Sequence, residues 1–98
     1  MDNTEKTNYA TPSAKCLEHA FKLGVVHDKA IMSDYWTDSL DKKVLIGVRD
    51  NEEKLLIKSE EEYTSPISKI FQTTSEYIIM TENSIYIVSK DIETKGIR

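Results

Sequence analysis

The clearest pattern in this chain is a pair of apolar segments near its C-terminal end. Residues 77–80 read Tyr-Ile-Ile-Met, residues 85–88 read Ile-Tyr-Ile-Val, and a tight turn at Glu82 and Asn83 lies between them. A strand with one wet face alternates apolar and polar residues, because successive side chains point to opposite faces. These segments do not alternate, so we expect both faces of the hairpin to be covered. The cover is a helix, a closing barrel or another copy of the chain.

An amphipathic helix is predicted over residues 11–23. Thr11 can accept a hydrogen bond at the start of a helix, Pro12 suits its first position, and Gly24 suits its end. On a helical wheel the sequence divides into an apolar and a polar half, which is typical of a helix lying on a core. The apolar half holds Ala14, Cys16, Leu17, Ala20, Phe21 and Leu23, and the polar half holds Lys15, Glu18, His19 and Lys22.

The middle of the chain predicts short strands. Residues 30–36 are ambiguous, because Asp28 could cap a second helix there, but their β-branched and aromatic content favours a strand. A hairpin is predicted from residues 43–49 and 54–58. Gly47, in the middle of its first strand, indicates a bulge or a bend.

Three more strands are predicted, one starting at Ile67, one over residues 76–81 and one over residues 84–89. The polar ends predict flexible tails over residues 1–10 and 93–98, which leaves a single domain over residues 11–92. The connections are short, and short connections make antiparallel neighbours, whereas parallel crossovers need a dozen or more residues.

We therefore expect an α+β fold with an N-terminal amphipathic helix. The helix is expected to pack on a strongly bent antiparallel β-meander, or on a small SH3-like barrel, of about five or six strands. A doubly wound parallel sheet is not expected, because the connections are too short for it.

Composition indicates one small globular domain. The chain has 98 residues, of which 39% are hydrophobic and 31% charged, and its net charge is −4. A single cysteine cannot form an internal disulfide, and no run approaches the ~18 apolar residues of a membrane span. The polar N-terminal segment lacks the apolar stretch of a signal peptide. We expect a soluble intracellular protein of the cytoplasm, without a membrane partner.

Patterns that carry catalytic chemistry are sparse. The three glycines lie far apart, so no phosphate-binding loop is predicted. Cys16 and His19 fall on different arcs of the helix, which disfavours a zinc site. The helical wheel turns Cys16 inward, which disfavours a reactive thiol paired with His27. A cluster of carboxylates beside an aromatic ring is formed by Asp34, Asp38, Asp41 and Trp36. Such a cluster can begin a glycosidase site, but turns and helix caps need the same residues. Neither an enzyme activity nor a cofactor is predicted.

Residues 63–67 and 77–86, with Asp34, Tyr35 and Trp36 upstream, form a pattern that resembles short β-rich proteins of large DNA viruses. The chain's many lysines and isoleucines agree with the AT-rich genomes of such viruses. The resemblance extends over roughly residues 28–92 and implies a β-rich, virus-associated protein. It implies no activity, and no functional residue follows from it.

The apolar surplus on the strands favours a non-catalytic structural or protein-interaction module. One helix covers one face of a sheet, so the remaining apolar face is expected to contact a second copy of the chain or another protein. We expect a homodimer or a bound protein partner. The predicted contact face consists of Tyr77, Ile79, Tyr86 and Val88.

A small nucleic-acid-binding barrel is the alternative. Residues 42–58 carry five basic side chains against three acidic ones, and a basic surface is what binds phosphates. The basic residues are Lys42, Lys43, Arg49, Lys54 and Lys58. The chain as a whole is acidic, which disfavours this alternative. A small enzyme of unknown reaction is the third hypothesis.

Overall fold

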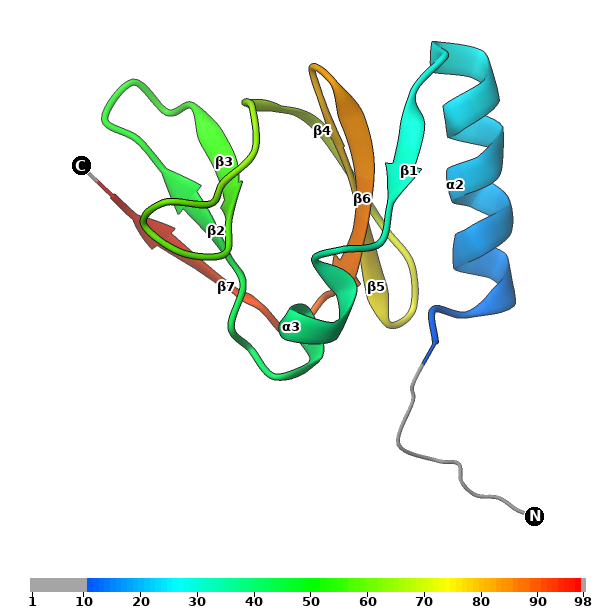
Figure 1. Cartoon of the computed structure of the whole chain (residues 1–98), viewed down its shortest axis with the longest axis horizontal. Helices are drawn as coiled ribbons and strands as arrows, with labels where there is room; N and C mark the ends of the chain where they lie inside the picture. The colour runs from blue at the N-terminus through cyan, green and yellow to red at the C-terminus, as the bar shows by residue number, and fades with distance from the viewer. Residues whose placement is uncertain (1–10, 98) are drawn as a thin grey trace.

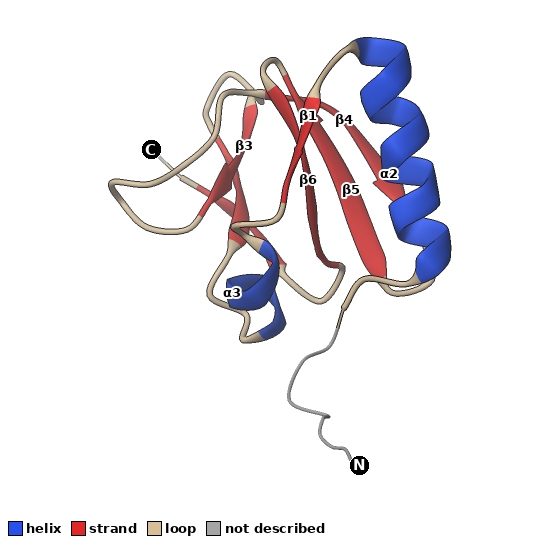
Figure 2. Cartoon of the chain, turned by 45° about the vertical axis from the view of Figure 1, so that its right-hand side comes forward, coloured by secondary structure: helices blue, strands red, loops and turns tan. Residues whose placement is uncertain are grey.

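The computed structural model describes residues 11–97, and within them the chain forms three layers (Figure 1). Helix α2 (Ala14–His27) is one outer layer, a four-stranded central sheet is the middle layer, and a three-stranded outer sheet is the third. The strands are β1 (Ala30–Met32), β2 (Leu45–Val48), β3 (Lys54–Ile57), β4 (Ile67–Gln72), β5 (Glu76–Thr81), β6 (Ser84–Ser89) and β7 (Glu93–Gly96). A short helix, α3 (Trp36–Leu40), lies at one end of the space between the two sheets (Figure 2).

Both sheets are open and mixed, and the α+β class is confirmed. The central sheet has the order β1-β6-β5-β4, with β1 parallel to β6, and the outer sheet has the order β3-β2-β7, with β7 parallel to β2. The purely antiparallel meander and the closed barrel were therefore wrong. The parallel pairs join segments that lie far apart in sequence, such as Ala30 with Ser84 and Leu45 with Glu93. Local hydrophobic patterns contain no signal for such pairs.

The predicted hairpins are confirmed. Strands β2 and β3 pair in antiparallel register inside the predicted segments 43–49 and 54–58. Strand β4 begins at Ile67, and β5 and β6 span residues 76–81 and 84–89, as predicted. Short apolar runs and turn chemistry are enough to position these neighbouring strands.

Gly47 is not at a bulge. The register of β2 and β3 runs unbroken through it and pairs it with Leu55. A Cβ atom at this position would lie 2.4 Å from Ile57 Cδ1 and 2.9 Å from Ile97 Cδ1, which is closer than packed atoms can approach. The glycine therefore leaves room for two isoleucine side chains on the outward face of the outer sheet.

Most of the predicted C-terminal tail, residues 93–98, is a strand. Residues Glu93–Gly96 form β7, and the backbone N–H of Ile97 donates to the Val48 carbonyl oxygen at 2.8 Å. The polar sequence gave no sign of this strand, because its order comes from pairing with β2. The other predicted tail, residues 1–10, lies outside the described residues.

The strand expected over residues 30–36 is confirmed only for β1. The chain then turns, and α3 begins at Trp36. Two hydrogen bonds favour the helix: the backbone N–H of Ser89 donates to Ser39 Oγ at 2.9 Å, and Ser39 Oγ donates to the Trp36 carbonyl oxygen at 2.6 Å. The contact with β6 therefore overrides the β propensity of this segment.

Helix α2 begins and ends later than predicted. Its N-cap is Ser13 rather than Thr11, and the Ser13 side chain accepts a hydrogen bond from a backbone N–H of the first turn. The helix continues through Gly24 and ends at Asp28, which has the left-handed φ of 53° that aspartate tolerates. A Cβ at Gly24 would lie 3.0 Å from the Lys29 carbonyl oxygen, so the glycine permits a close approach.

Both faces of the central sheet are buried, as expected. The cluster on the α2 side contains Cys16, Ala20, Ile78, Met80, Ile85 and Ile87. The cluster on the other side contains Tyr35, Val44, Ile46, Leu56, Ile79, Val88 and Ile92. The chain's own outer sheet therefore covers the second face.

Candidate functional site

Three exposed apolar residues of the helix form one row along α2. Leu17, Phe21 and Val25 are 40%, 66% and 80% exposed, and their spacing of four residues places them on one side of the helix. We call these three residues the α2 stripe. The sequence grouped Leu17 and Phe21 with the buried half of the helix, and this grouping is wrong for both.

A groove runs between the α2 stripe and strand β1. It has a volume of about 730 Å³ and is lined by Leu17, Phe21, Gly24, Val25, Asp28, Lys29 and Ile31. Gly24 brings the helix close to the strand, since a Cβ there would touch Ile31 Cδ1 at 3.6 Å. We call this hollow the α2–β1 groove.

The two flanks of α2 differ in character. The flank beside β1 carries the apolar α2–β1 groove, and β1 is an edge strand of the central sheet. The opposite flank faces the turn between β4 and β5 and is polar, being lined by Ser13, Lys15, Glu18, His19, Lys22, Thr73, Thr74 and Ser75. The apolar flank therefore borders a strand edge that no other described strand pairs with.

A buried carboxylate fixes the N-terminus of α2. Glu76, at the start of β5, accepts hydrogen bonds from the backbone N–H of Ser13 at 2.7 Å, from Ser13 Oγ at 3.2 Å and from Thr73 Oγ1. Burial alone would raise the pKa of Glu76, but the hydrogen bonds from Thr73 and Ser13 outweigh burial and lower the pKa. A negative charge at a helix N-terminus is also favourable to the helix dipole. This contact anchors α2 and has a structural role.

Cys16 is buried beneath α2, beside Glu76. Burial, and then the nearby negative charge of Glu76, raise the pKa of the Cys16 thiol to about 11. The thiol is therefore protonated at neutral pH, and a protonated buried thiol is a poor nucleophile and a poor metal ligand. Cys16 packs as a small apolar side chain, as predicted.

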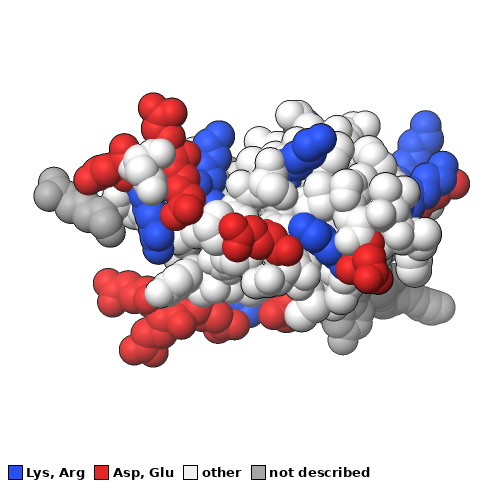
Figure 3. Space-filling model, turned by 90° about the horizontal axis from the view of Figure 1, so that it is seen from above, with Lys and Arg blue, Asp and Glu red and all other residues white. Residues whose placement is uncertain are grey.

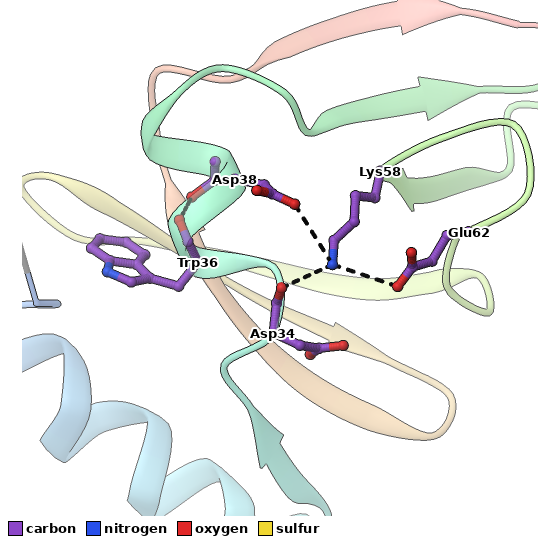
Figure 4. A network of polar contacts seen from close by, with 6 residues as sticks. Asp34, Trp36, Asp38, Lys58 and Glu62 are labelled. Atoms are coloured by element: carbon purple, nitrogen blue, oxygen red, sulfur yellow. Dashed lines mark hydrogen bonds and ion pairs between the residues drawn. The ribbon is translucent and has the colours of Figure 1, made fainter.

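Lys58 joins the outer sheet to α3 (Figure 4). Its Nζ lies 3.7 Å from Asp38 Oδ2 and 3.5 Å from Glu62 Oε2, and it donates to the Asp34 carbonyl oxygen at 3.0 Å. The same atom lies 4.6 Å from the centre of the Tyr35 ring, a cation–π contact. Burial, followed by the charge of Glu62, raises the pKa of Tyr35 to about 12. We call this set the Lys58 network.

The predicted contact face lies inside the chain. Ile79 and Val88 are fully buried against the outer sheet, and Tyr77 and Tyr86 pack against the same cluster. Ile79 and Val88 are therefore core residues of the described fold, and Tyr77 and Tyr86 are partly buried beside them. The burial of both faces of the hairpin is confirmed, and the chain's own outer sheet covers the face on which these four residues lie.

The predicted nucleic-acid residues do not provide five free cations. Arg49 pairs with Glu53 at 3.0 Å, and Lys58 is held in the Lys58 network. The remaining three, Lys42, Lys43 and Lys54, are exposed. Acidic side chains gather at the same end of the molecule, over the outer sheet (Figure 3). This arrangement gives little positive surface for a phosphate backbone.

The carboxylates near Trp36 do not form a pocket with its ring. Asp38 pairs with Lys58, and the Trp36 side chain points away from this pair (Figure 4). Among residues 11–97, no group of three or more histidine, cysteine or acidic side chains is arranged to hold a metal ion. In the same residues, no helix is both long enough and apolar enough to cross a membrane.

No family model, curated protein or solved structure matches this chain. The resemblance to β-rich proteins of large DNA viruses therefore stays a prediction. A function has to be inferred from the geometry of the described residues. In that geometry, the α2–β1 groove combines exposed large apolar side chains with the edge of a strand.

Proposed function

We propose that this chain is a non-catalytic protein-interaction module that docks a protein partner in the α2–β1 groove. The observation that carries the proposal is the exposure of the α2 stripe. Leu17, Phe21 and Val25 project from a helix whose adjacent side, with Cys16 and Ala20, already packs on the central sheet. Contiguous apolar surface of this kind marks interaction sites in soluble proteins.

The free energy gained by covering the α2 stripe fits a weak docking site. Fully burying a leucine, phenylalanine or valine side chain contributes about 1.5–3 kcal/mol. Scaled by the exposed fractions of the three residues, covering the α2 stripe contributes on the order of 3–6 kcal/mol. Association also costs translational freedom and side-chain ordering, so the stripe alone supports weak binding. Additional contacts in the same groove are needed for a stable complex.

The other described groups support a binding role more than a catalytic one. The Cys16 thiol is buried with a raised pKa, Glu76 is saturated with hydrogen bonds, and Asp38 is paired with Lys58. Each of these polar groups already has a structural partner. None of them faces the α2–β1 groove, whose lining is mainly apolar.

The proposal is tested by selecting ligands from a random peptide library on the folded chain. Val25→Lys and Val26→Lys are matched variants: both residues are exposed valines on α2, 80% and 75% respectively, but only Val25 lines the groove. Selected peptides are expected to lose about tenfold or more in affinity for Val25→Lys, because a charge replaces a buried valine contact. Val26→Lys is expected to bind within about twofold of the unmodified chain.

Circular dichroism and thermal unfolding show whether both variants stay folded. Equal losses for the two variants would mean that the binding surface is not this groove. Failure to select any peptide that distinguishes the chain from an unrelated protein would also contradict the proposal.

A further inference from the structure

Within residues 11–97, strand β1 has one unpaired edge, which lies next to the α2–β1 groove. It is the terminal strand of the central sheet and pairs only with β6 among the described strands. Among residues 11–97, its backbone makes no hydrogen bond outside that ladder. An edge strand presents a row of free N–H and C=O groups that can pair with another extended segment. Apolar side chains and free backbone groups therefore border one hollow.

The geometry of the groove fits one added strand. Helix α2 packs across β1, β6 and β5, so a strand placed beyond β1 would lie about 4.8 Å further out, beside the α2 stripe. Alternate side chains of such a strand would point towards the helix and cover Leu17, Phe21 and Val25. A strand of about seven residues spans roughly 23 Å, which matches the length of about 21 Å expected for the 14-residue helix.

The charge of the lining indicates an uncharged occupant. The groove contains one acidic and one basic residue, Asp28 and Lys29, and Lys29 Nζ is already hydrogen-bonded to the Thr81 carbonyl oxygen. Nucleic acids and anionic lipid surfaces are attracted by an excess of basic residues, which this lining lacks. An apolar segment without net charge therefore matches the groove best.

The size of the surface disfavours a second folded copy as the occupant. A stable dimer buries roughly 800 Å² on each partner. One row of three partly exposed side chains and a three-residue strand edge are a smaller surface than that. A short extended segment needs less area, because backbone hydrogen bonds to an exposed strand supply part of its affinity.

We infer that the α2–β1 groove binds an extended, uncharged, apolar segment of another protein, which pairs with β1 as a fifth strand of the central sheet. This inference rests on the proposed function and adds the chemistry of the partner to it. The backbone of the segment pairs with the β1 edge, and every second side chain packs on the α2 stripe. The α2 stripe and the β1 edge are then two halves of one site.

The test uses a blocked peptide of about seven residues in which valine and threonine alternate, titrated into the ¹⁵N-labelled chain. Two control peptides carry N-methyl groups on alternate amides, one on the odd and one on the even positions. Consecutive N–H groups of a strand point in opposite directions, so only one of the two sets faces β1. That methylated peptide is expected to bind about tenfold or more weakly than the parent, and the other within about twofold.

Amide shifts of Ala30, Ile31 and Met32 are expected to move with the parent peptide, and Val25→Lys is expected to weaken its binding about tenfold. If both methylated peptides bind as well as the parent while Val25→Lys still abolishes binding, strand pairing is refuted and the proposed function stands. If no peptide binds at millimolar concentration, the inference is overturned, while library selection still decides the proposed function. Light scattering that shows a dimer lost in Val25→Lys would replace the extended segment by a second copy.

Discussion

Helix α2 and the outer sheet, the two layers that cover the central sheet, differ in how far their own apolar side chains are buried. On the outward face of the outer sheet, Leu55 is still buried, because Gly47 lets Ile57 and Ile97 pack beside it. Helix α2 does the opposite: its fully buried residues, Cys16 and Ala20, are small, and the larger Phe21 and Val25 remain largely exposed. Apolar side chains are thus better covered on the outer sheet than on α2, although Tyr63 beside the outer sheet is 53% exposed.

This difference distinguishes the side chains of α2 that hold the fold together from those that do not. Cys16, Ala20 and the partly buried Leu23 pack α2 on the central sheet, and Glu76 fixes the start of the helix. The α2 stripe contributes little to either contact. Exposed apolar side chains that the fold does not use are the best candidates for binding.

The largest expected contrast between the layers is in stability. Leu56→Ala empties a fully buried site between the two sheets and should lower the free energy of unfolding by about 2–5 kcal/mol. Phe21→Ala removes an exposed ring from α2. It should change the free energy of unfolding by no more than about 0.5 kcal/mol, because alanine also favours the helix. Urea unfolding followed by circular dichroism measures both. A loss for Phe21→Ala as large as that for Leu56→Ala would show that the stripe belongs to the core.

A smaller effect is expected at the anchor of α2. Glu76→Gln keeps the shape of the side chain but weakens the charge-assisted hydrogen bonds from Ser13 and Thr73. The free energy of unfolding should fall by about 1–3 kcal/mol. Glu18→Gln, at an exposed position on the same helix, should be nearly neutral and serves as the control.

The Glu76 contribution should depend on pH with a defined sign. The pKa of Glu76 is lower in the folded chain than in the unfolded chain, so its stabilisation is present above the ordinary glutamate pKa of about 4.3. That stabilisation is lost as the pH falls through the folded-state pKa. The stability gap between the unmodified chain and Glu76→Gln should therefore narrow in acid. A gap that stays constant from neutral to acidic pH would contradict the assignment of a charged, hydrogen-bonded carboxylate.

The sequence predicted the parts of this fold that depend on neighbouring residues. The hairpin of β5 and β6 follows from two apolar runs around a short turn, and their two-sided burial follows from the missing alternation. The sequence did not predict that the chain's own outer sheet covers the second face of this hairpin. The outer sheet depends on the parallel pair of β2 and β7, in which the polar Glu93 and Lys95 lie beside Leu45 and Gly47. No local pattern reports such a pair.

The candidate site was missed because a helical wheel locates apolar residues without choosing which of them face the core. The apolar half of α2 is wider than the stripe that a sheet can bury. A finer signal was present in the spacing. Cys16, Ala20 and Gly24 form a row of small residues that allows close packing, and the larger row of the α2 stripe lies one residue further along the helix. Two such rows predict that the small row faces the sheet and the large row faces outward.

The smallest expected effect concerns the Lys58 network, which ties the outer sheet to α3. Lys58→Met keeps the aliphatic stem over Tyr35 but removes the charge near Asp38 and Glu62. The free energy of unfolding should fall by about 0.5–1.5 kcal/mol. Lys54→Met, at an exposed position of β3, is the matched control and should be nearly neutral. Because salt screens exposed ion pairs, the difference between the variants should shrink in about 1 M salt. If Lys54→Met proves as costly as Lys58→Met, loss of general surface charge explains the effect, and the outer layer is held by its apolar core alone.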